Sequence, residues 1–149
     1  VPGFASKKTR GYVDELRALA KPDPRIKIIP PVTSREVVMT INKYDLGIFL
    51  LPPINFNYEN TLPNKLFDFI QARLGVAIGP TPEMAEIVNH YHIGVVSNDF
   101  TASSLAERLS ALTKNEIEKF KGNATPAAKE LNAEINAAKI DNLISSILG

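Results

Sequence analysis

The chain has 149 residues, a length that favours a single domain. Its 44% of hydrophobic residues suffice for a core, and its formal net charge of +1 gives no sign of a polyanion partner, so nucleic acid is not an expected ligand. The absence of cysteine excludes disulfides and thiolate metal sites, and no apolar run of about 18 residues predicts a membrane span.

The first pattern along the chain predicts a helix followed by a strand. Apolar residues recur at helical spacing over 12–20, and the prolines at 22 and 24 end this helix. Ile26-Lys27-Ile28-Ile29 then predicts a short strand, which Pro30 and Pro31 terminate.

The next pattern predicts a second helix–strand pair. Thr33 and Glu36 match a capping box, with a hydroxyl at the cap and a glutamate three residues later, so we expect a helix from there to about Asn42. The unbroken apolar run over 46–51 is typical of a strand that is buried on both faces.

A polar and aromatic loop at 52–60 leads into a further helix that begins near Pro63. Proline fits the first helical position, and Thr61 can cap the helix with its hydroxyl. Lys65 and Asp68 share one helix face, where they could simply form an ion pair. Free helix N–H groups beside a lysine also suit an anion, so this stretch is the main candidate for a binding site.

The second half continues the alternation of strands and helices. We expect strands at about 76–79 and 93–97, and we interpret His90 and His92 as capping or surface residues rather than metal ligands. The expected helices cover 83–89, 102–112 and 113–121, and the last of them starts at a capping box formed by Thr113 and Glu116. Residues 122–126 are expected to break this helix. An apolar stripe in the C-terminal helical segment at 126–148 predicts a docked helix.

The alternation predicts an α/β fold, with a Rossmann-like parallel sheet and helices on both faces. Ligands of such sheets bind outside the carboxyl ends of the strands. The loops expected to carry ligand chemistry are therefore Pro30–Thr33, Pro52–Pro63, Gly79–Pro82 and Ser97–Thr101.

Three strings give the chain a family resemblance: YDLGIFLLPP at 44–53, LPNKLFDFIQARLGVAIG at 62–79 and EMAEIVNHYHIGVV at 83–96. In this order and spacing they resemble the C-terminal half of a GT-B glycosyltransferase, over roughly residues 12–112. The resemblance implies that residues 1–149 form a single, partial Rossmann-like domain that binds a nucleotide sugar.

The resemblance also implies roles for individual residues. Asp68 stands where the family usually has a glutamate that holds the ribose hydroxyls, and Asn60 stands near the sugar or its phosphates, where many relatives have an acid. Lys65 would meet the diphosphate, while Glu59 could contact the sugar or be a plain loop charge. The implied donor-binding residues are Asn60, Thr61, Leu62, Pro63, Asn64, Lys65 and Asp68, and the implied base or sugar loops contain Pro31, Val32, Glu59 and Gly79.

The chain departs from the family in several ways. Arg73 replaces a usual glycine and Gly75 a usual proline. The family's C-terminal half also begins with two more strands, so we expect a fragment with an incomplete sheet of four strands and no acceptor half. Its open sheet edges would then favour self-association or another partner.

The function implied by the resemblance is that of the donor-binding half of a glycosyltransferase, which moves a sugar from a nucleotide-diphosphate sugar to an acceptor. Its partner would be an N-terminal acceptor domain of the same parent protein, and no metal or cofactor is expected in this domain. No catalytic residue is assigned. The expected location is the cytoplasm, with membrane association through the missing half. Two alternatives stay open: a nucleotide-sugar epimerase of the same fold, or a non-catalytic interaction module.

Overall fold

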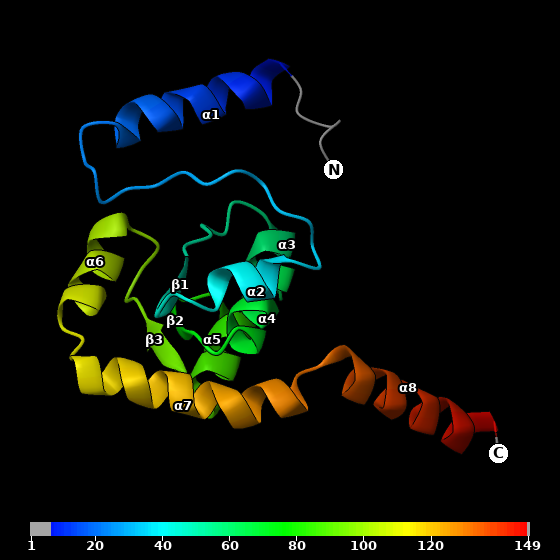
Figure 1. Ribbon diagram of the computed structural model, residues 1–149. Coiled ribbons are helices and arrows are strands. Elements are labelled where there is room, and N and C mark those ends of the chain that lie inside the picture. Colours follow the sequence, from blue (N-terminus) through cyan, green and yellow to red (C-terminus); the bar gives the residue numbers. More distant parts are fainter. Residues whose placement is uncertain (1–6, 149) are drawn as a thin grey trace. The chain divides into compact units, whose positions relative to one another are not determined.

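The computed structural model describes residues 7–148, and the chain divides into two compact units, Val1–Val37 and Val38–Gly149. Figure 1 labels the elements along the chain. In order they are α1 (Lys7–Ala20), α2 (Val37–Ile41), β1 (Leu46–Phe49), α3 (Phe56–Glu59), α4 (Asn64–Gln71), β2 (Gly75–Ile78), α5 (Pro82–His90), β3 (Gly94–Val96), α6 (Ala102–Ser110), α7 (Lys114–Glu130) and α8 (Ala133–Leu148).

The first unit contains α1 but not the strand expected after it. Residues 26–29 belong to no helix or strand, and Ile26, Ile28 and Ile29 are 54%, 43% and 47% exposed. The prediction of a strand at 26–29 is therefore wrong. A strand requires a hydrogen-bonded neighbour, and no described segment pairs with these residues, so β-propensity alone does not make one.

Only half of the expected capping box at Thr33 and Glu36 forms, and it closes a turn rather than starting a helix. The backbone N of Glu36 donates to the carbonyl oxygen of Thr33 at 2.9 Å, not to its hydroxyl. Glu36 Oε2 accepts hydrogen bonds from the backbone N of Thr33 at 3.0 Å and from its Oγ1 at 2.6 Å, and these bonds lower the pKa of the Glu36 carboxyl. The helix α2 begins only at Val37 and ends at Ile41, one residue before the expected end.

The second unit is built on a three-stranded parallel sheet in the order β1-β2-β3, which confirms the α/β class and the incomplete Rossmann-like sheet. The central strand β2 is buried at all four of its residues. The edge strand β1 is not buried on both faces as predicted, because Ile48 is 53% exposed.

The core lies on the face of the sheet that α4 and α5 cover. Side chains of β2 meet those of both helices there, and buried alanines of α7 complete the cluster. Its buried members are Leu66, Ile70, Val76, Ile78, Met84, Val88, Ile93, Ala124, Ala127 and Ala128.

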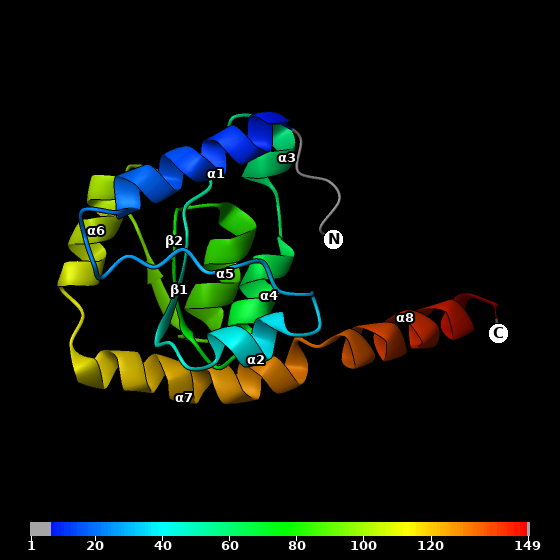
Figure 2. The same cartoon turned by 45° about the horizontal axis from the view of Figure 1, so that its top comes forward.

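The helix α7 runs along the amino ends of the three strands, and Figures 1 and 2 both show it crossing beneath them. Near β1, Lys121 Nζ contacts Asp45 Oδ1 at 2.8 Å; at the start of β2, Phe120 lies against Gly75. Just before β3, Asn123 Nδ2 donates to the carbonyl oxygen of His92 at 2.8 Å. These contacts explain why one long helix forms where the sequence predicted two segments.

The predicted break at 122–126 is thus wrong, because α7 continues through Pro126 to Glu130. A proline inside a helix removes one backbone hydrogen bond and costs about 3 kcal/mol. The buried alanines of α7 and two hydrogen bonds from Gln71 Nε2, to the carbonyl oxygens of Ala128 at 2.9 Å and Leu131 at 3.0 Å, oppose this cost.

The C-terminal helix α8 carries the expected apolar stripe, but the stripe is exposed rather than docked. Ile140, Leu143 and Ile147 are 57%, 61% and 73% exposed. The backbone between α7 and α8 bends at Leu131, which leaves the helical conformation with φ −100° and ψ 57°. No described helix is both long enough and apolar enough to cross a membrane.

Two glycines provide a test of this packing. A Cβ at Gly94 would collide with the backbone of Val76, whereas a Cβ at Gly122 would have no atom within 4 Å. We expect Gly94→Ala to lower the free energy of unfolding by about 2 kcal/mol or more, because β3 would have to move away from β2. Gly122→Ala should raise it by about 0.5–1 kcal/mol, because alanine is the better helix former. Urea denaturation measures both variants, and equal effects would contradict the close strand packing.

Candidate functional site

The candidate site begins where β1 and β2 end side by side. Phe49 and Ile78 are paired, so the residues after them leave the sheet at one edge. At this edge a Cβ on Gly79 would lie 3.0 Å from Leu50 Cδ1 and 2.8 Å from Phe100 Cδ1. The loops after β1 and β2 are therefore neighbours, as the sequence predicted.

The loop after β1 contains the short helix α3, which uses the polar residues around it. Asn55 Oδ1 accepts a hydrogen bond from the backbone N of Tyr58 at 2.9 Å, and Asn60 Nδ2 donates to the carbonyl oxygen of Phe56 at 3.0 Å. Both asparagines thus terminate α3. The side chain of Glu59 is exposed.

The helix α4 starts one residue later than predicted. Pro63 is its N-cap, with φ −75° and ψ 149°, rather than its first helical residue. No side chain caps this terminus, so the prediction that Thr61 caps it is wrong. A proline occupies the cap position, and its side chain has no hydrogen-bond acceptor. The backbone N of Leu66 bonds to Pro63 O at 3.0 Å, and the first-turn amides before it have no side-chain partner.

Close packing seats α4 on the sheet. A Cβ at Gly47 of β1 would collide with the ring of Phe69, so glycine at this position lets the helix approach the strand. On the adjoining helix face Leu66 and Ile70 are buried, at 1% and 0% exposure. Of the eight residues of α4 only these two are buried, and this packing fixes which of the others remain at the surface.

Lys65 and Asp68 remain there, and they do not pair with each other. The Nζ atom of Lys65 lies 5.0 Å from the ring centroid of Phe49. The Asp68 carboxylate is partly buried and forms no hydrogen bond or ion pair with any described residue, and its burial raises its pKa. The salt-bridge interpretation of the two residues is therefore wrong, and an acceptor group is left at the edge of the site without a donor.

Thr81 lies at this edge of the sheet, and the sequence did not predict the burial of its side chain. It is 0% exposed, it is the N-cap of α5, and its Oγ1 has no hydrogen-bond partner within the described structure. The sequence Thr81-Pro82-Glu83 signals a helix start. It does not signal that the hydroxyl is buried, because burial depends on how the loop folds over the sheet edge.

Arg73, the departure from the family's glycine, has a backbone conformation that usually favours glycine. Its φ is 61° at the end of α4, where a side chain costs roughly 1–2 kcal/mol. The guanidinium offsets this cost locally, since Arg73 Nη1 donates to the carbonyl oxygens of Gln71 at 2.7 Å and Ile70 at 3.2 Å. The departure is thereby explained as a helix cap.

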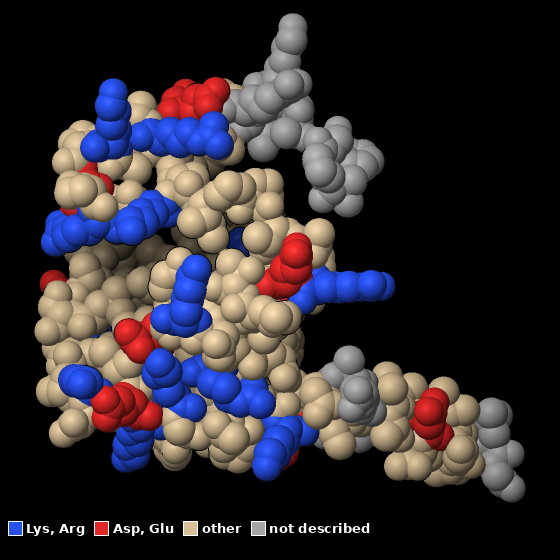
Figure 3. Space-filling view, in the orientation of Figure 1, with Lys and Arg blue, Asp and Glu red and all other residues tan. Residues whose placement is uncertain are grey.

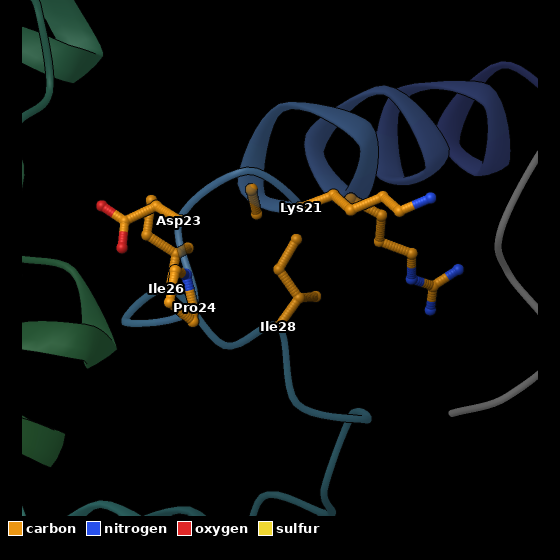
Figure 4. A pocket seen from close by; sticks show the side chains of 7 residues that line it. Lys21, Asp23, Pro24, Ile26 and Ile28 are labelled. Carbon is orange, nitrogen blue, oxygen red and sulfur yellow. The ribbon is translucent and has the colours of Figure 1, made fainter.

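Gly79 lies beside Leu50 and Phe100, residues 59–68 lie between β1 and β2 along the chain, and Pro31 and Val32 belong to the first unit. Neither of two cavities found elsewhere is lined by residues of 59–68. One, of about 330 Å³, lies in the first unit, where Figure 4 shows Ile28 pointing toward the last turn of α1. The other lies beside α7, over which Figure 3 shows acidic and basic side chains mixed.

Comparisons of the chain with models of protein families, with curated proteins and with solved structures gave no match. Among the described residues, no group of three or more His, Cys, Asp or Glu side chains could hold a metal ion. The geometry of α4 and its neighbouring loops is therefore the basis for any functional proposal.

The unpaired carboxylate of Asp68 gives a prediction about pH. Burial raises its pKa, so the charged form costs the folded chain free energy at neutral pH. We expect Asp68→Asn to unfold at higher urea concentration than the wild type at neutral pH. This gain should disappear as the pH falls through the raised pKa, because the wild-type carboxyl is then protonated as well.

The matched control is Glu107→Gln, at an exposed acid on α6. We expect this variant to change the free energy of unfolding by no more than about 0.5 kcal/mol. Loss of stability in Asp68→Asn at neutral pH would show instead that the carboxylate is held by a favourable interaction.

Proposed function

We propose that this chain is the donor-binding part of a glycosyltransferase, which holds a nucleotide-diphosphate sugar at the carboxyl edge of its sheet. One observation carries the proposal: the partly buried Asp68 carboxylate has no donor among the described residues. Carboxylates at the surface of a fold usually face water or a cation, and a partly buried carboxylate without a protein donor is a candidate ligand group.

The residues around Asp68 suit the parts of such a donor. A ribose has two neighbouring hydroxyl groups, and a carboxylate can accept a hydrogen bond from each of them. The uncapped start of α4 offers backbone N–H groups to a diphosphate, and the ammonium group of Lys65 adds a positive charge on the same helix. Asn60 and Glu59, at the end of α3, would approach the sugar.

The chemistry proposed for this part is positioning and charge stabilisation. The first-turn amides of α4 and Lys65 would stabilise the negative charge that grows on the departing diphosphate. The acceptor and any general base would come from a partner half of the parent protein. We therefore expect no sugar transfer by residues 1–149 alone, and measured transfer by this chain in isolation would contradict the division of roles.

There are two alternative functions. One of them would use the same donor site, and the other would have no donor site. An epimerase of this fold would bind the nucleotide sugar through the same residues but needs no separate acceptor, so product analysis of the parent protein separates it from a transferase. A non-catalytic interaction module would bind no nucleotide sugar, and the exposed apolar stripe of α8 is the observation that favours it.

Calorimetric titration with UDP-, GDP- and ADP-sugars tests the proposal. We expect saturable binding of one of them, weakened roughly tenfold to a hundredfold in Asp68→Ala and in Lys65→Ala, because each variant loses a hydrogen bond to a charged group. Lys129→Ala, at an exposed lysine on α7, should bind as the wild type does. No binding of any nucleotide sugar, or equal binding by all variants, would refute the donor site.

A further inference from the structure

A second cavity opens at the opposite edge of the sheet, where the strands begin. Its volume is about 500 Å³, within the usual range of ligand pockets, roughly 300–1,000 Å³. It lies between the end of α5, the start of β3 and one side of α7, entirely within the second unit. Its lining residues are Val88, Asn89, His92, Gly94, Glu116, Lys119, Phe120 and Asn123.

The polar groups of this cavity include both donors and acceptors. Asn89, His92 and Lys119 can donate hydrogen bonds, and Lys119 forms no ion pair with any residue that the structure describes. Glu116 Oε2 accepts hydrogen bonds from the N and Oγ1 of Thr113, at 2.8 and 2.7 Å, while its Oε1 has no partner in the described part of the chain. Hydrogen bonds from Thr113 lower the pKa of Glu116, so an acceptor persists in the wall.

The conformation of His92 is a second, independent observation. Its φ is 51°, in the left-handed region that glycine adopts most readily, and it directly follows α5 as the residue after the cap. The comparable Arg73 offsets this strain with two hydrogen bonds to carbonyl oxygens. The side chain of His92 is exposed and forms no hydrogen bond with any described residue, so its imidazole can meet a ligand.

Two contacts hold the wall of the cavity, and only one of its polar side chains, that of Asn123, takes part in them. Asn123 Nδ2 donates to the backbone oxygen of His92 at 2.8 Å, which ties α7 to the start of β3. Phe120 is partly buried against Gly75 and presents the remaining apolar surface. The cavity therefore combines one phenyl ring with a rim of amide, imidazole, ammonium and carboxylate groups.

We infer that this cavity binds a neutral hexopyranose unit, at a site separate from the proposed nucleotide-sugar site. Sugar hydroxyls donate and accept hydrogen bonds equally well, which matches the mixed rim, and the C–H face of a pyranose ring suits the phenyl ring of Phe120. The opposite charges of Glu116 and Lys119 leave the lining without a net charge, which favours a neutral ligand, and the five polar side chains of the lining disfavour a purely apolar one.

Amide NMR titration of the 149-residue chain with methyl gluco-, galacto- and mannopyranosides tests the inference. We expect saturable shift changes confined to the cavity residues for at least one of the three sugars. Asn89→Ala and Lys119→Ala should each weaken binding by about tenfold, because each loses a hydrogen bond to the sugar. Lys129→Ala, on the same helix outside the cavity, should leave the titration unchanged.

His92→Gly separates a binding role from a structural one. Glycine removes the backbone strain, so the variant should unfold at higher urea concentration than the wild type, and yet it should bind the sugar more weakly. No saturable shift with any of the three sugars, shifts that Asn89→Ala leaves unchanged, or shifts caused by inorganic phosphate but not by sugars would overturn the assignment.

Discussion

The packing of the second unit depends on the complete burial of β2 between its two parallel neighbours. Gly94 brings β3 so close to Val76 that no side chain fits between them, and Gly47 of β1 lets the ring of Phe69 lie on the strand. Small residues at these positions allow the sheet to form and α4 to pack on it. All four residues of β2 are buried, so its side chains are the surface against which α4, α5 and α7 build the core.

Polar groups without hydrogen-bond partners lie toward both ends of this central strand. At its carboxyl end, α4 begins without a side-chain cap and Asp68 lies without a donor. At its amino end, α7 crosses the starts of the strands and borders a cavity with a mixed polar rim. The two edges of the sheet thus offer different chemistry: amides and a lysine for a diphosphate at one edge, and a neutral hydrogen-bonding rim at the other.

Much of the second unit could be predicted from the sequence, because its local signals agree with its packing. The strands at 46–49, 75–78 and 94–96 and the capping box of Thr113 and Glu116 follow directly from apolar runs and cap residues. The strand expected at 26–29 failed because pairing needs a neighbour that periodicity cannot supply. The helix break expected at 122–126 is wrong because contacts between distant segments act against the local signal. Buried alanines keep α7 helical in spite of Pro126.

The sequence could predict which loops lie at the carboxyl edge of the sheet, but not the state of their side chains. The loops after β1 and β2 meet there, where Gly79 lies beside Leu50. That Lys65 lies over Phe49 instead of pairing with Asp68 depends on how α4 packs on β1. The buried hydroxyl of Thr81 and the cavity at the other edge likewise depend on contacts between segments far apart in the sequence.

The donor site is tested most directly by hydrogen exchange at the first-turn amides of α4, with and without a nucleotide sugar. Binding of a diphosphate to these groups should slow the exchange of the amides of Asn64 and Lys65, and the slowing should be lost in Asp68→Ala. Unchanged exchange at these amides under conditions where a nucleotide sugar binds elsewhere on the chain would contradict the account.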